Sequence, residues 1–230
     1  MGNSIFSIRK DARSAGLFYL LHILLIIYGV IFVSLKLGIS GTDEMANKIL
    51  SNEFLFRTGI FSRILSVIPT LLLASALYKL LEKVNIKQAR FMFTLIIISI
   101  PFQFIAEVFN ITSLMIAKGE LLKSSTSQQR HEFIVLFINI YNNVVSIAEI
   151  FRGLWLFPFG LLIYNSKFFP RILGLLLFAG GIGYLIDYTT FLFSPMYRSV
   201  TVIGLLMGFI CEILIMLWLI IKGVKHPFEP

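Results

Sequence analysis

Cysteine and charged residues are both scarce in this 230-residue chain, and each scarcity excludes a class of protein. The single cysteine, Cys211, leaves no intrachain disulfide and no cysteine-rich metal site. Charged residues make up 14% of the chain, hydrophobic residues make up 57%, and the mean hydropathy is +0.88. Such a chain has too little polar surface for a soluble domain. The composition therefore predicts an integral membrane protein.

Catalytic sequence motifs are missing as well. The chain has no HExxH pair, no nucleophile elbow and no glycine-rich phosphate loop after a strand. Its three histidines, His22, His131 and His226, share no spacing typical of metal ligands. We therefore predict no catalytic residue, no metal and no cofactor. An intramembrane enzyme that acts on lipid, with an acid as general base, ranks last among the functional alternatives.

Long apolar runs account for nearly the whole chain. A helix rises about 1.5 Å per residue, so about 20 residues cross roughly 30 Å of hydrocarbon. The sequence predicts an all-α, polytopic bundle of six transmembrane helices in one domain. These helices are expected at residues 14–36, 60–82, 91–117, 133–165, 171–194 and 199–222.

Lysine and arginine are concentrated in alternate connections between the apolar runs. Cytoplasmic loops of membrane proteins retain positive charge. The basic stretches before the first helix, after the second and fourth, and at the end include Arg9, Lys83, Lys167, Lys222 and Lys225. The pattern predicts a multi-pass protein of the cell inner membrane with both termini cytoplasmic. We therefore attribute the net charge of +8 to the basic residues that set the topology and attract anionic lipid headgroups. No nucleic-acid partner is expected.

Ionisable side chains lie inside every apolar run. A charged group at the bilayer centre costs about 2.5 kcal/mol or more, so such residues normally face the protein interior and mark a site or pathway. On the third and fourth runs the polar residues recur every three or four positions and share a helix face. The candidate ligand-binding or polar-core residues are His22, Arg63, Glu107, Asn142, Glu149, Arg152, Asp187 and Glu212.

Acids outnumber arginines in this candidate core. Four carboxylates accompany Arg63 and Arg152, and their estimated depths allow one shared network. At least one carboxylate then needs a proton, a cationic group, a metal ion or water as its partner. The favoured hypothesis is binding or transport of a small molecule or ion in a buried polar cavity. The alternative is a structural or accessory protein whose charges serve only helix packing.

A pair of small residues precedes the acid of the last helix. Gly204 and Gly208 lie on the same face as Glu212 and permit close helix contact. That contact is expected either within one chain or between chains. A homo-oligomer and another membrane protein are therefore both predicted as alternative partners, alongside the surrounding membrane lipids.

Four stretches of the chain resemble a known family. They are ARSAGLFYLLHILL, NEFLFRTGIFSRIL, FRGLWLFPFGLLIYNSKFFPRILGLLLFAGGIGYLID and CEILIMLWLIIKGVK. Together, over nearly the whole chain, they resemble the bacterial membrane family named domain of unknown function 4386. The most specific part runs from Gly153 to Asp187. The resemblance implies a six-helix bacterial inner-membrane protein; it implies no reaction and no catalytic residues.

Overall fold

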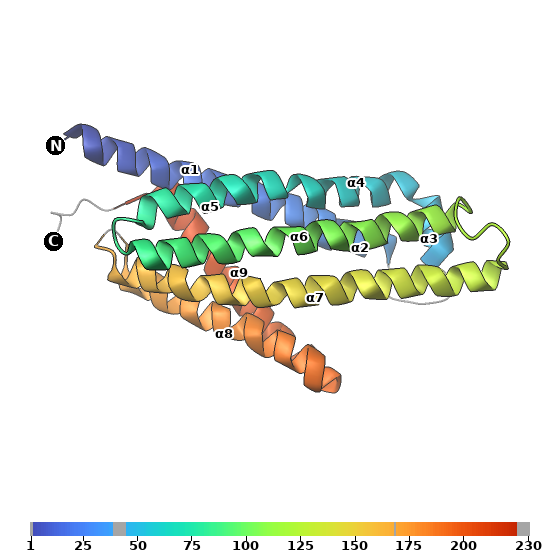
Figure 1. Ribbon diagram of the computed structural model, residues 1–230. Coiled ribbons are helices and arrows are strands. Elements are labelled where there is room, and N and C mark those ends of the chain that lie inside the picture. Colours follow the sequence, from blue (N-terminus) through green and yellow to red (C-terminus); the bar gives the residue numbers. More distant parts are fainter. Residues whose placement is uncertain (1, 39–44, 168, 225–230) are drawn as a thin grey trace. The chain divides into compact units, whose positions relative to one another are not determined.

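The computed structural model describes residues 2–38, 45–167 and 169–224, which form helices joined by short turns and contain no strand (Figure 1). The side chains at 2–8, 45, 195 and 198–200, and Lys225 of the basic tail, lie outside that description. Six helical runs are long and apolar enough to cross a membrane. They are Arg9–Leu37, Glu53–Leu81, Ile86–Ala117, Ser127–Asn165, Arg171–Phe193 and Thr201–Ile221. The prediction of an all-helical protein with six spans is confirmed.

The first two spans each combine several helical elements. The first joins α1 (Gly2–Ile26), the π-helical turn η1 (Ile27–Phe32) and α2 (Val33–Leu37), and α3 (Met45–Ser51), α4 (Glu53–Leu65) and α5 (Val67–Leu81) follow. The remaining spans are α6 (Ile86–Ala117), α7 (Ser127–Asn165), α8 (Arg171–Phe193) and α9 (Arg198–Ile221), with a 3₁₀ turn, η2 (Pro195–Tyr197), before α9.

Several helices begin earlier than hydropathy predicts. The helix α6 starts at Ile86 rather than 91, and α7 starts at Ser127 rather than 133. Polar side chains explain both starts. The Asn85 side chain accepts a hydrogen bond from the Gln88 amide (3.1 Å), while Thr126 and Gln129 cap each other's amides at 2.9 and 3.2 Å. Capping satisfies the first backbone N–H groups, so these helices extend beyond their apolar residues.

Residue contacts divide the chain into two compact units. Unit 1 contains residues 1–21, 68–99 and 146–230, and unit 2 contains residues 22–67 and 100–145. Each unit is described separately below. The prediction of a single domain stays a prediction.

In unit 1, α8 and α9 pack with their backbones in contact. A β-carbon at Gly204 would lie 3.0 Å from the carbonyl oxygen of Gly183, and one at Gly180 would lie 3.0 Å from the Cα of Gly208. Such distances leave no room for side chains at these positions. The predicted small-residue seam therefore joins two helices of the same chain.

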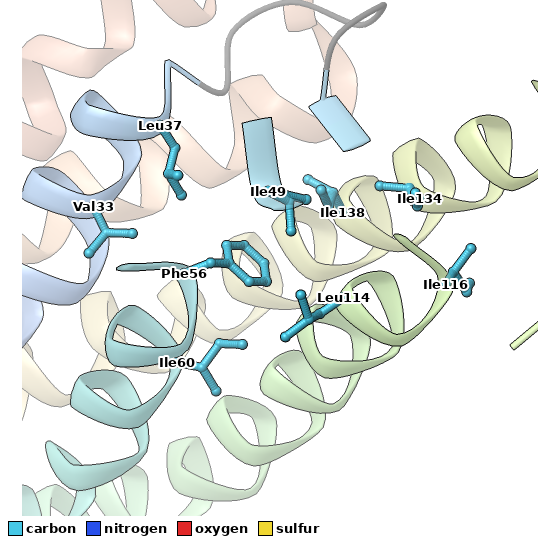
Figure 2. Packing of buried hydrophobic residues seen from close by; sticks show 9 residues of the cluster. All are labelled: Val33, Leu37, Ile49, Phe56, Ile60, Leu114, Ile116, Ile134 and Ile138. Atoms are coloured by element: carbon cyan, nitrogen blue, oxygen red, sulfur yellow. The ribbon is translucent and has the colours of Figure 1, made fainter. Parts of the chain in front are cut away.

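Unit 2 has a hydrophobic cluster of its own. Figure 2 shows its nine side chains, which come from α2, α3, α4, α6 and α7: Val33, Leu37, Ile49, Phe56, Ile60, Leu114, Ile116, Ile134 and Ile138. Charged residues lie at the start of α4 and just after the end of α6. Lys118 lies 2.9 Å from Glu120 and 3.5 Å from Glu53, and the hydrogen bond with Glu120 raises the pKa of Lys118.

Large apolar side chains are also exposed along the spans. On α9, Ile203, Ile210 and Leu217 are 66, 55 and 41% exposed, and they follow each other at intervals of two helical turns. A stripe of this kind is costly in water and suits hydrocarbon. The exposed faces therefore agree with a multi-pass membrane protein.

Candidate functional site

The carboxylate of Glu212 is the centre of a polar cluster in unit 1. It accepts hydrogen bonds from Tyr19 of α1 and Tyr184 of α8, each at 2.7 Å. Arg152 of α7 lies 3.9 Å from the same carboxylate. We call Tyr19, Arg152, Tyr184 and Glu212 the Glu212 cluster. It ties together side chains from four helices around a group that is 3% exposed.

Backbone packing explains how Tyr184 reaches Glu212. A β-carbon at Gly208, one turn before Glu212, would lie 2.7 Å from the Tyr184 ring. The glycine therefore makes space for that ring. On the other side, the ring of Tyr19 lies 6.4 Å from that of Trp155, which is stacked on Phe159. Aromatic packing thus holds Tyr19 in position.

Arg152 is the least satisfied member of the Glu212 cluster. Its guanidinium lies over the Tyr184 ring, 5.6 Å from the ring centroid, and its side chain is 30% exposed. The Glu212 carboxylate oxygen lies 3.9 Å from the Arg152 Nε, which is beyond hydrogen-bond distance. Both oxygens of Glu212 are meanwhile occupied by tyrosine hydroxyls. Arg152 is therefore a partly exposed arginine within a membrane span whose guanidinium is not hydrogen-bonded to Glu212.

Two further predicted acids also belong to unit 1. Glu149 is half-buried one turn before Arg152 and interacts with it electrostatically. Asp187 is 2% exposed, and its Oδ1 accepts a hydrogen bond from Thr201 at 2.9 Å. Its Oδ2 is buried and has no donor in the described part of the chain. Asp187 is thus a half-satisfied carboxylate between α8 and α9.

In unit 2, Arg63 of α4 and Glu107 of α6 form a two-pronged ion pair. The guanidinium Nε and Nη2 donate to the two carboxylate oxygens at 2.5 and 2.9 Å. Asn110 donates to Glu107 at 3.1 Å, and the Tyr141 ring lies 5.4 Å from the Arg63 guanidinium. We call Arg63, Glu107, Asn110 and Tyr141 the Arg63 cluster. Both charges are neutralised and hydrogen-bonded, in contrast to Arg152.

The π-helical turn η1 supplies another partner for Arg63. The Arg63 Nη1 donates to the carbonyl oxygen of Gly29 within this turn. A β-carbon at Gly29 would lie 2.8 Å from the Arg63 side chain and 3.0 Å from the carbonyl oxygen of Gly59. Because π-helical turns often occur at functional sites, this irregular backbone singles out the Arg63 cluster.

The last two predicted residues, His22 and Asn142, also lie in unit 2. The His22 ring is 9% exposed, with Nδ1 3.5 Å from the Ser66 carbonyl oxygen. Asn142 is exposed and lines a cavity beside Arg63. The structure thus distributes the eight predicted residues over two units. Arg152 and Glu212 belong to the Glu212 cluster and Arg63 and Glu107 to the Arg63 cluster, whereas the other four lie outside both clusters. One network shared by all of them stays a prediction.

Three tyrosines complete these clusters, and polarity alone does not identify them. Tyr19 lies in an apolar stretch, where a tyrosine indicates aromatic packing. Tyr141 is surrounded in sequence by Asn139, Asn142 and Asn143, which indicate a polar face without identifying Tyr141 as part of a cluster. Tyr184 shares a helix face with Asp187, but its bond to Glu212 depends on Gly208 of another helix. The sequence therefore indicates that Tyr184 lies on a polar helix face, but it does not predict which group each tyrosine hydroxyl binds.

No metal-binding group of three or more His, Cys, Asp or Glu side chains occurs among the described residues. In comparisons with known proteins, a family model described as "Domain of unknown function (DUF4386)" matches residues 14–223. A protein of Archaeoglobus fulgidus described as uncharacterized is 34% identical over 91 residues, or 38% of this chain and 51% of that relative. The chain thus matches about half the length of this curated relative. No solved structure matches.

Proposed function

This chain belongs to the DUF4386 family, and on that premise we propose that it binds a small carboxylate-bearing solute inside the membrane, with Arg152 as the anchor. The observation that carries the proposal is the partly exposed Arg152 side chain, whose Nε lies 3.9 Å from the Glu212 carboxylate and so beyond hydrogen-bond distance. An arginine in a membrane span without acceptors is costly. A carboxylate offers two oxygens that match its planar N–H donors.

The position of the Glu212 cluster suits a solute site. Glu212 lies nine residues before the end of α9 at Ile221, or about 14 Å along the helix. That is about half of the roughly 30 Å hydrocarbon thickness. Solute sites of secondary transporters are typically near the bilayer midplane. The location therefore supports binding in the course of transport.

The charges around Arg152 narrow the choice of solute. Glu212 already accepts two short hydrogen bonds and lies 3.9 Å from Arg152, so it leaves the outer N–H donors open. Glu149, one turn away on α7, adds a second negative charge nearby. A simple anion is repelled by both acids, whereas a solute that also carries an ammonium group is attracted by Glu149. The cluster therefore favours a zwitterionic carboxylate.

Ligand-induced stabilisation tests the proposal. The thermal midpoint of the purified protein in nanodiscs would be measured with glycine, alanine, serine, acetate, succinate and sodium chloride at equal ionic strength. Wild type should be stabilised saturably by a zwitterionic carboxylate, because a ligand that binds the folded state raises its stability. Arg152→Gln should lose this response. Arg171→Gln is the matched control, because Arg171 also lies over a tyrosine ring, that of Tyr164.

A second measurement covers the case in which Arg152→Gln does not fold. Arg152→Lys keeps the charge and loses the two-pronged geometry, so it should weaken stabilisation without abolishing folding. An Arg152→Cys, Cys211→Ala protein should also react with a charged thiol reagent if water reaches the site. No reaction in folded protein, together with equal ligand responses in all variants, would leave the accessory role, in which the charges serve helix packing alone. Uptake of a stabilising solute into proteoliposomes would then separate transport from binding.

A further inference from the structure

A small cavity lies beside the Arg63 cluster, entirely within unit 2. Its volume is about 110 Å³. Because a water molecule occupies about 30 Å³ in the liquid, the cavity has room for roughly four waters or one small organic molecule. The exposed residues Ser34 and Asn142 are part of its wall, so the cavity is accessible from the protein surface.

Part of the lining of this cavity is polar and held in place. It contains Ser34, Arg63, Asn110, Tyr141 and Asn142. Of the five N–H groups of a guanidinium, Arg63 commits three to Glu107 and Gly29, so two remain for another acceptor. The hydrogen bonds within the Arg63 cluster fix the guanidinium before any ligand arrives. A pre-organised wall of this kind lowers the cost of binding.

The rest of the lining is apolar. It consists of Val33, Leu37, Phe56 and Ile138, which also belong to the hydrophobic cluster of unit 2 (Figure 2). The lining of the cavity therefore combines hydrogen-bonding groups with hydrocarbon. Pockets that bind small molecules combine these features, with a few placed polar groups in an otherwise apolar lining.

Charge determines which small molecule fits. Glu107 neutralises Arg63 through two hydrogen bonds, and the other polar wall residues, Ser34, Asn110, Tyr141 and Asn142, are uncharged. A charged ligand would lose its hydration without gaining a counter-ion. We infer that this cavity is a second binding site, separate from Arg152, for a small uncharged amphipathic molecule with a hydroxyl or amide head and a short apolar tail.

Primary alcohols of increasing chain length are the probes for this site. Binding to the full-length protein in nanodiscs would be followed by ligand-observed NMR from ethanol to octanol. A cavity of defined size gives saturable binding that strengthens with chain length and then falls at a cut-off. Partition into the bilayer increases steadily with chain length, because each buried CH₂ contributes about 0.8 kcal/mol. A steady increase with no cut-off would overturn the inference.

Matched variants locate the binding. Asn142→Trp fills the cavity entrance and should weaken alcohol binding by about tenfold or more, equivalent to 1.4 kcal/mol. Asn139→Trp is the control, because Asn139 is exposed on the same helix and does not line the cavity. Ile138→Ala enlarges the cavity and should move the cut-off to a longer alcohol. Equal binding by both tryptophan variants, or an unchanged cut-off in folded Ile138→Ala, would refute the site and leave the Arg152 proposal untouched.

Discussion

The ring of Tyr184 occupies the space that a side chain at Gly208 would need. A β-carbon at Gly208 would lie 2.7 Å from the ring, closer than unbonded carbons approach each other. Through this arrangement the Tyr184 hydroxyl reaches Glu212, one turn further along α9. A glycine, which has no side chain, thus controls the geometry of the polar cluster.

Gly208→Ala should therefore disrupt the Glu212 cluster. The added methyl group forces Tyr184 away and should lower the free energy of unfolding by about 1–3 kcal/mol, as overpacking commonly does. Denaturant titration in detergent would measure the change. Val202→Ala on the exposed face of α9 is the control and should have little effect. Full stability in Gly208→Ala would mean that Tyr184 does not need this space.

The two tyrosine hydroxyls should each stabilise the folded protein through the charge of Glu212. Removal of one hydrogen bond to a carboxylate, by Tyr19→Phe or Tyr184→Phe, should cost about 1.5–3 kcal/mol. In a Glu212→Gln background the same substitutions should cost less, because the acceptor is neutral. Double-mutant cycles of unfolding free energy test this, with Tyr188→Phe as the control on the same helix. If the tyrosine and Glu212 substitutions change the free energy of unfolding additively, the hydroxyls are not coupled to the carboxylate.

The stability of the folded protein should suffer far more from the loss of one partner of the Arg63–Glu107 pair than from the loss of both. Glu107→Leu leaves a buried guanidinium without its carboxylate and should cost about 3–5 kcal/mol. The double variant Arg63→Met, Glu107→Leu removes both charges and should recover much of that loss. Arg57→Met, which breaks an exposed pair with Glu53, should change stability by no more than about 1 kcal/mol. A double variant that is less stable than either single variant would argue against this prediction.

Asp187→Asn should be tolerated at neutral pH. The buried Oδ2 lacks a donor within the described ranges, so its charge is poorly compensated, while an asparagine oxygen still accepts the Thr201 hydroxyl. The thermal midpoint should stay equal or rise. Asp187→Ala should lower it, because the Thr201 hydroxyl loses its acceptor. A marked loss of stability in Asp187→Asn would show that the carboxylate charge has a partner in addition to Thr201.

Much of the architecture follows from sequence patterns. Apolar runs of about 20 residues predict the six spans because a bilayer demands that length. Their starts are less predictable, since capping by Asn85 and Thr126 extends α6 and α7 into polar sequence. The ionisable residues within the spans likewise mark the candidate clusters, because such residues are costly in hydrocarbon.

The sequence by itself determined that this is an all-helical membrane protein with buried acids and arginines, because helix length and burial cost depend on residues close together in the chain. Only the tertiary structure decided which charges meet. Tyr19 and Glu212 are separated by 193 positions and share a hydrogen bond. Arg63 makes two hydrogen bonds to Glu107, whereas Arg152 lies 3.9 Å from Glu212. Such pairings depend on how helices rotate and approach each other, which close contacts at Gly29, Gly183 and Gly208 govern.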